Sequence, residues 1–153
     1  MRFFLAGIMQ GSRLDRGIHS QDYRQIIREA IKARYPEADV ICPFEMHPAS
    51  VSYDDETGKR TLLHEMSMAA EADGLIAFVP EASMGTAIEI WQAFQAGKPI
   101  WTISPLSANW VIRFLSNKVF SDLEEFVAFV GAGGMDSWLQ CSQETNSRCD
   151  QSW

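Results

Sequence analysis

The architecture of this chain can be inferred from one stretch, Ser83-Met84-Gly85-Thr86-Ala87-Ile88-Glu89-Ile90-Trp91. A continuous apolar run, Leu75 to Val79, precedes it, and Gly97-Lys98-Pro99 closes the segment that follows. A short continuous apolar run is typical of a strand buried on both faces. Serine is a preferred helix N-cap, and glycine before a proline ends a helix. The stretch therefore predicts a buried strand, a short loop and a helix that extends to about Ala96.

The same alternation of strand and helix recurs on both sides of this stretch. Further apolar runs predict strands at residues 3–9, 39–42, 99–103 and 118–120. Apolar residues at helical spacing predict helices at residues 18–34, 62–70, 109–116 and 121–130. Alternating strands and helices form a parallel sheet that is covered on both faces. We therefore predict one α/β domain over residues 1–130, with a five-stranded parallel sheet flanked by helices on both faces in a flavodoxin-like, three-layer arrangement.

Two segments show no clear periodicity. Residues 43–60 contain two prolines, a glycine and a run of acidic residues, and they predict a long loop. Residues 131–153 are rich in glycine, serine and glutamine, and they predict a poorly ordered C-terminal tail.

Composition and charge restrict the partners. The chain has 46% hydrophobic and 22% charged residues, as soluble globular proteins do. Its net charge of −7 argues against a nucleic-acid polymer as partner, since a phosphate backbone needs a basic surface. A small anionic ligand needs only a local cluster of donors. The three cysteines form neither a disulfide framework nor a metal-ligand pattern, and no segment approaches the length of a membrane span. We expect a cytoplasmic protein with no membrane partner and no metal.

A ligand site is expected at one edge of the predicted sheet. Ligands of open parallel sheets bind at the carboxyl ends of the strands. The loops that follow the first and third strands, Gln10 to Arg13 and Pro80 to Gly85, both lie on that edge. Ser83 as N-cap and Gly85 in the first turn would leave backbone N–H groups open to an anion. The alternative is that Ser83 only caps the helix.

Glu89 is the candidate for chemistry on this helix. Its neighbours one and two turns away are small (Gly85, Thr86, Ala93 and Ala96), so its carboxylate would project from a face with room for a ligand. It lies six residues after Ser83, or roughly 9 Å along the helix axis. This spacing suits a ligand with an anionic end at the cap and its reacting carbon one sugar away. The alternative is a solvated glutamate on the helix surface.

Two segments also resemble a known family. Residues 72–99, with the core Ser83 to Ile90, resemble the nucleoside 2-deoxyribosyltransferase superfamily. The N-terminal segment Phe4-Leu5-Ala6-Gly7-Ile8-Met9-Gln10-Gly11-Ser12-Arg13-Leu14-Asp15-Arg16 is similar to its branch of 2′-deoxynucleoside 5′-phosphate N-hydrolases. The resemblance extends over residues 3–130 and implies an enzyme that cleaves or exchanges an N-glycosidic bond, with no cofactor and a nucleoside or nucleotide as substrate.

The resemblance also implies roles for individual residues. Glu89 matches the glutamate that attacks C1′ of the sugar, and Glu65 matches, by spacing, the acid that protonates the departing base. The implied substrate-binding residues are Phe4, Gly7, Gln10, Gly11, Ser12, Arg13, Ser83, Gly85, Ser107 and Asn109. In the family, the segment that matches Ser107 and Asn109 enters the active site of the other subunit, so a homodimer is expected; the alternative for Ser107 is a helix N-cap.

The chain departs from the family pattern at three positions. Gln10 stands where the hydrolase branch has an arginine, Phe4 where it has a tyrosine, and Glu65 where it usually has an aspartate. These departures keep other functions open: base exchange by a transferase, or nucleotide binding without catalysis. An electron carrier on the same fold is a third alternative. His47 and His64 lack partners at metal-ligand spacing, and we do not expect a zinc site.

Overall fold

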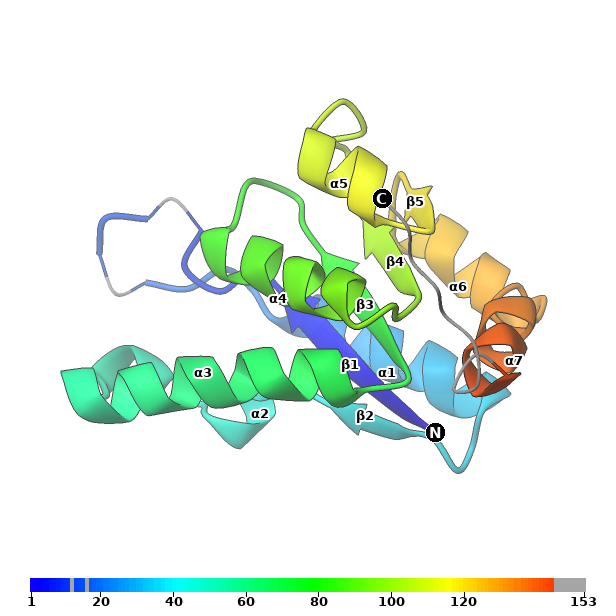
Figure 1. Cartoon of the computed structure of the whole chain (residues 1–153). Helices are drawn as coiled ribbons and strands as arrows, with labels where there is room; N and C mark the ends of the chain where they lie inside the picture. Colours follow the sequence, from blue (N-terminus) through cyan, green and yellow to red (C-terminus); the bar gives the residue numbers. More distant parts are fainter. Residues whose placement is uncertain (12, 16, 145–153) are drawn as a thin grey trace.

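The computed structural model describes residues 1–11, 13–15 and 17–144, and its centre is a five-stranded parallel sheet (Figure 1). The strands are β1 (Arg2–Gly7), β2 (Asp39–Ile41), β3 (Gly74–Phe78), β4 (Ile100–Ile103) and β5 (Lys118–Phe120). Their order across the sheet is β2-β1-β3-β4-β5, and every pair is parallel. This is the flavodoxin-like order, and it confirms the predicted fold class.

Helices cover both faces of the sheet. They are α1 (Asp22–Arg34), α2 (Pro43–Met46), the 3-10 turn η1 (Ser50–Ser52), α3 (Asp55–Glu71), α4 (Met84–Gln95), α5 (Trp110–Leu115), α6 (Leu123–Gly131) and α7 (Asp136–Glu144). α3, α4 and α5 pack on one face, and α1, α6 and α7 pack on the other (Figure 1). No helix in the described ranges is long and apolar enough to cross a membrane.

The alternation of side chains along β1 explains why this strand is apolar throughout. Phe3 and Leu5 point to the α1 and α6 side, whereas Phe4 and Ala6 point to the α3 and α4 side. Each of these four side chains is almost completely buried. A strand between two helical layers needs apolar residues at every position, as the sequence pattern indicated.

The edge of β1 that faces β2 is only partly paired. β2 ends at Ile41, which lies opposite Phe4. β1 continues to Gly7, and its other edge pairs with β3 along this whole length. In the described sheet, Leu5 to Gly7 therefore have no strand partner on the β2 side. Buried carbonyl groups there require another donor.

The prediction of a long loop over residues 43–60 was wrong. Pro43 begins α2, Ser50–Ser52 form η1, and α3 begins at Asp55. The Asp54 side chain caps α3 by accepting a hydrogen bond from the Thr57 amide at 2.7 Å. An aspartate followed by two further acidic residues is a favourable start for a helix, because negative charge is stabilised at the helix N-terminus.

The segment after residue 130 also differs from the predicted poorly ordered tail. α6 ends at Gly131, and α7 follows after a short turn. Met135 is completely buried and Leu139 nearly so, both in the core beneath α1 and α6. The Asp136 side chain accepts hydrogen bonds from Arg34 and Tyr35 at the end of α1. Apolar burial and these bonds explain why residues 131–144 pack on the domain; residues 145–153 lie outside the described part.

Candidate active site

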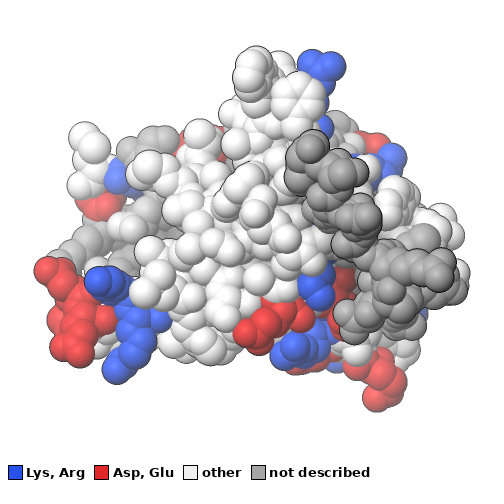
Figure 2. All heavy atoms as spheres, viewed as in Figure 1, with Lys and Arg blue, Asp and Glu red and all other residues white. Residues whose placement is uncertain are grey.

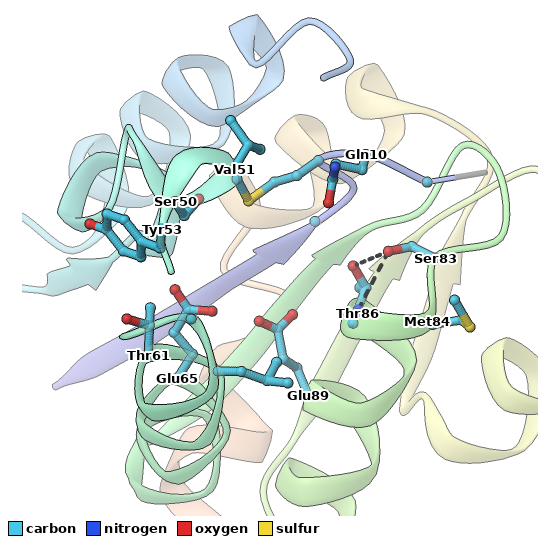
Figure 3. Close-up of a pocket in the computed structure, with 16 residues that line it drawn as sticks. Gln10, Ser50, Val51, Tyr53, Thr61, Glu65, Ser83, Met84, Thr86 and Glu89 are labelled. Atoms are coloured by element: carbon cyan, nitrogen blue, oxygen red, sulfur yellow. Dashed lines mark hydrogen bonds between the residues drawn. The ribbon is translucent and has the colours of Figure 1, made fainter. Parts of the chain in front are cut away.

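A cavity of about 350 Å³ opens at the carboxyl ends of β1 and β3, where the order of the strands reverses. Four parts of the chain line it: the end of β1 and its following loop, the η1 segment, α3 and the first turns of α4 (Figure 3). Its lining residues are Gly7, Met9, Gln10, Gly11, Ser50, Val51, Tyr53, Gly58, Thr61, Leu62, Glu65, Ser83, Met84, Gly85, Thr86 and Glu89. The cavity thus lies at the edge where the sequence predicted a ligand site.

Glu89 lies in the second turn of α4, and its carboxylate points into the cavity (Figure 3). The residue is only 8% exposed. Burial raises the pKa of Glu89 to about 8; the negative charge of Glu65 adds to the shift, and the positive charge of Arg24 partly offsets it. This carboxyl group therefore holds its proton far more strongly than an exposed glutamate does.

Glu65 lines the same cavity from α3 (Figure 3). Burial raises the pKa of Glu65 as well, and the charges of Arg24 and His64 lower it. Glu65 is only partly buried, so its carboxylate loses less hydration than that of Glu89. When the two groups share one proton, desolvation therefore favours its place on Glu89.

The N-terminus of α4 forms another wall of the cavity. Ser83 is the N-cap: its Oγ accepts a hydrogen bond from the Thr86 amide at 3.5 Å and lies 3.0 Å from Thr86 Oγ1 (Figure 3). A Cβ atom added to Gly85 would meet nothing within 4 Å. The first turn is therefore open to the cavity, as the sequence predicted, and its free amides can bind an anion.

The charges around the cavity are unbalanced. Its lining includes two glutamates, and none of the described lining residues is a lysine or an arginine. Gln10 lines the cavity, but Arg13 is exposed at the end of a turn in which its amide donates to the Gln10 carbonyl oxygen. An anion at α4 would therefore be bound by backbone dipoles and hydroxyl groups rather than by a cationic side chain.

The structure brings together seven of the predicted site residues and leaves others apart. Phe4 is completely buried in the core between β1 and the α3/α4 layer and is not among the residues that line the cavity. Ser107 is exposed, and Asn109 caps α5 by accepting from the Val111 amide at 3.0 Å. Asn109 lines a separate cavity between α4 and α5. Ser12 lies outside the described residues.

Sequence reasoning missed several residues of the site. Ser50, Tyr53 and Thr61 line the cavity because η1 and the start of α3 fold over it, in the segment that was predicted to be a loop. Arg24 was also missed, although its charge acts on both carboxylates. It stands three residues before Ile27 on the buried face of α1. An arginine on an apolar helical face was the available signal.

Residues 1–11, 13–15 and 17–140 contain no cluster of three His, Cys, Asp or Glu side chains that could hold a metal ion. The described lining residues offer the carboxyl groups of Glu65 and Glu89 and several hydroxyl groups to the cavity.

Comparison with solved structures bears on the fold. A 2-deoxyribosyltransferase from Bacillus psychrosaccharolyticus superposes with a TM-score of 0.60 over 83% of this chain and 90% of that chain, at 16% sequence identity. The chain therefore has a 2-deoxyribosyltransferase-like fold. A conserved protein from Enterococcus faecalis matches 87% of this chain and 98% of that chain, with a TM-score of 0.60 and 18% identity. BcmB, a CMP N-glycosidase from Clostridium botulinum, matches 87% of this chain and 99% of that chain, with a TM-score of 0.52 and 21% sequence identity.

No protein-family model matches the chain, and a search of curated proteins finds no match either. The solved structures thus agree with the fold expected from the sequence resemblance, and at these identities they establish the fold alone.

Proposed function

We propose that this protein cleaves the N-glycosidic bond of a nucleoside 5′-monophosphate. The observation that carries the proposal is that Glu65 and Glu89 line one cavity whose wall includes the open N-terminus of α4. Two carboxyl groups, one to attack and one to donate a proton, are what glycosidic bond cleavage with a covalent intermediate requires. The likeness of the fold to a 2-deoxyribosyltransferase and to a CMP N-glycosidase supports the proposal.

In the proposed reaction, a carboxylate oxygen of Glu89 attacks C1′ of the sugar. The bond between C1′ and the base nitrogen breaks, its electron pair passes to the base, and the Glu65 carboxyl group protonates that base. The product is a free base and an ester between C1′ and Glu89. Glu65, now ionised, accepts a proton from water, and the oxygen of that water attacks C1′ and releases Glu89. The sugar 5-phosphate then leaves, and the original protonation state is restored.

α4 would orient the substrate by binding its phosphate at the helix N-terminus and its C1′ carbon beside Glu89. The six residues from Ser83 to Glu89 correspond to roughly 9 Å along the helix axis, about the length of a sugar 5-phosphate. A phosphate at the free amides of Met84 and Gly85 would thus set C1′ beside the Glu89 carboxylate. Glu65 and Tyr53, on the other side of the cavity, would then lie toward the base.

The reactive form requires the proton on Glu65 and the charge on Glu89. The deeper burial of Glu89 by itself favours the opposite arrangement, with the proton on Glu89. The transition state of glycosidic cleavage carries positive charge on the sugar ring. This charge favours an ionised Glu89, so the catalytic arrangement gains stability as the bond breaks.

A second candidate is the exchange of bases on an uncharged nucleoside by a transferase. Two observations favour it: none of the described lining residues is cationic, and Gln10 stands where the hydrolase branch has an arginine. A neutral nucleoside would need no cation at α4. The covalent ester at Glu89 is common to both reactions, and only the group that resolves it differs.

We also propose that the protein acts as a homodimer. Met84 on α4 and Trp110 on α5 are 83% and 77% exposed, and Ile88, Trp91 and Phe114 are exposed nearby on the same two helices. Figure 2 shows that uncharged atoms dominate the centre of this face, over α4. Large exposed apolar areas mark interaction surfaces. A second copy on this face would bring its Ser107 and Asn109 toward the α4 region.

Base release from a panel of nucleosides and nucleoside 5′-monophosphates, with ribose and 2-deoxyribose, tests the proposed function. Wild type should release base from at least one monophosphate, and Glu89→Ala should not. Exchange that depends on a second free base would favour the transferase. Tight binding of an intact nucleotide without turnover, unchanged in Glu89→Gln, would favour a non-catalytic binding protein. Absence of base release from every substrate would contradict both enzymatic proposals.

A further inference from the structure

Arg24 is a buried cation behind the floor of the cavity. It is only 3% exposed, and among the described residues no carboxylate lies within ion-pair distance of it. A buried charge is costly unless other groups compensate it. Other groups around Arg24 must therefore stabilise its guanidinium group at this position.

Two carbonyl groups at the end of β1 hold the guanidinium group in place. Arg24 Nη1 donates to the Leu5 carbonyl oxygen at 3.0 Å, and Nη2 donates to that of Gly7 at 3.2 Å. Its Nε donates to Gln21 Oε1 at 2.6 Å. Leu5 to Gly7 have no strand partner on the β2 side of the described sheet, so Arg24 takes the place of the missing strand. Its planar fork of donors suits two carbonyl groups two residues apart.

The remaining contacts of Arg24 are apolar or weakly polar. Its guanidinium carbon lies 5.0 Å from the ring centre of Tyr23 and 5.8 Å from that of Phe44, and Nη1 lies 3.6 Å from the Cys42 sulfur. These groups solvate the cation poorly and carry no full negative charge. The opposite charge comes from the Glu65 and Glu89 pair, which lines the cavity together with Gly7 and carries one negative charge when it holds one proton.

We propose that Arg24 is the fixed counter-charge of the Glu65 and Glu89 pair, held behind the cavity floor by the end of β1. The effect of Arg24 on catalysis rests on the proposed function. Its electrostatic effect on Glu65 and Glu89 does not. Arg24 is thus a positioning residue: it shapes the floor at Gly7 and stabilises one negative charge on the pair, without touching the substrate.

The electrostatics of the site agree with this role. The charge of Arg24 lowers the pKa of both Glu65 and Glu89, against the effect of burial. The other titratable neighbours are Tyr23 and Cys42 beside Arg24, and His64 beside Glu65. Burial raises the pKa of Tyr23 well above its usual range, so this phenol stays neutral and cannot replace either carboxylate. One cation then faces two carboxyl groups, and the arrangement is neutral when the pair holds one proton, as the proposed reaction requires.

Titration of the pair by NMR of isotope-labelled glutamate carboxyl groups tests this inference. Glu65→Gln and Glu89→Gln assign the two signals. Arg24→Gln should raise the titration midpoints of the pair by about one pH unit or more, because it removes an opposite charge. Arg24→Lys should restore the midpoints even though it loses the fork to Leu5 and Gly7. Arg28→Gln, which removes a charge from the same helix where it pairs with Glu45, should leave them unchanged.

Arg24→Met is the second neutral variant, because its unbranched side chain can pack against Tyr23 and Phe44 if Arg24→Gln does not fold. Unchanged midpoints in a folded neutral variant would overturn the inference and leave Arg24 a purely structural residue. If these midpoints stay unchanged while wild type releases base, the inference fails and the proposed function stands. Shifted midpoints in a protein that releases no base would support the counter-charge and contradict the proposed function.

Discussion

Glu89 on α4 and Glu65 on α3 point into one cavity from two neighbouring helices of the same layer, and Glu89 is the more deeply buried (Figure 3). Because α3 and α4 pack against the same face of the sheet, the relative position of the two carboxyl groups is fixed by the core and not by a loop. The negative charge of Glu65 raises the pKa of Glu89, so the titrations of the two groups are coupled.

The burial of Glu89 predicts how stability depends on pH. The pKa of Glu89 is raised from 4.5 to about 8. Between these two values the unfolded chain loses a proton that the folded protein retains, so the contribution of Glu89 to stability is largest below about pH 4.5 and declines until about pH 8. Glu89→Gln should remove this decline and be more stable than wild type above about pH 8, by a few kcal/mol at most.

Urea unfolding from about pH 5 to about pH 9 measures this effect as a difference between the two proteins. Glu124→Gln, a neutralisation of an exposed glutamate on α6, is the matched control and should follow wild type throughout. Parallel stability curves for wild type and Glu89→Gln would contradict the raised pKa.

Glu65 is predicted to act as general acid, and its effect should depend on the leaving group. With an ordinary base, Glu65→Gln should slow the first turnover by a factor of about 100 or more, because the amide cannot donate the required proton. When the base is already cationic in the substrate, as in 7-methylguanosine 5′-monophosphate, it can leave without a proton. The same substitution should then reduce the rate of base release much less. Rapid-quench measurement of base release compares the two substrates; equal losses on both would exclude the assigned role.

Gly85 is predicted to keep the N-terminus of α4 open to phosphate. Gly85→Ala has room for its methyl group and should raise the stability of the helix by about 0.5–1 kcal/mol. The methyl group should also hinder phosphate, so KM should rise about tenfold for a 5′-monophosphate, a cost of about 1.4 kcal/mol, and remain unchanged for the nucleoside. Gly131→Ala, at the end of α6 and also without a neighbour within 4 Å, is the control. Equal KM changes for both substrates would speak against a phosphate at α4.

The exposed apolar face of α4 and α5 predicts a dimer in solution. Sedimentation velocity at micromolar concentration should give twice the mass of one chain, and Trp110→Ser should shift the protein to monomers and reduce base release. Leu14→Ser changes a fully exposed leucine of the first loop and should have no effect on the mass. A monomeric wild type that is fully active would refute the proposed dimer.

The sheet could be predicted because buried parallel strands leave a local mark in the sequence. Continuous apolar runs such as Leu75 to Val79 are unusual outside a covered sheet, and Ser83 as N-cap and Glu89 on a small-residue face are likewise local features. The buried strand, the N-cap and the glutamate all lie in the structure where the sequence predicted them.

The missed features depend on contacts between distant segments. α7 is ordered because Met135 and Leu139 fill the core beneath α1 and α6 and because Asp136 meets Arg34, 102 residues away in sequence. Arg24 belongs to the site only because β2 ends earlier than β1. Neither relationship can be inferred from local periodicity. The resemblance also implied a substrate contact for Phe4, but this side chain is completely buried in the core and does not line the cavity.

The nucleophile can be identified by trapping the ester. A nucleoside 5′-monophosphate with fluorine at C2′ should form the glycosyl-enzyme and resolve it slowly, because fluorine destabilises the oxocarbenium-like transition state of the second step. Mass spectrometry of the digested protein should then find one sugar phosphate on the peptide that contains Glu89, and none in Glu89→Gln. Release of base with no adduct on this peptide, or with an adduct on another residue, would contradict the assignment of Glu89 as nucleophile.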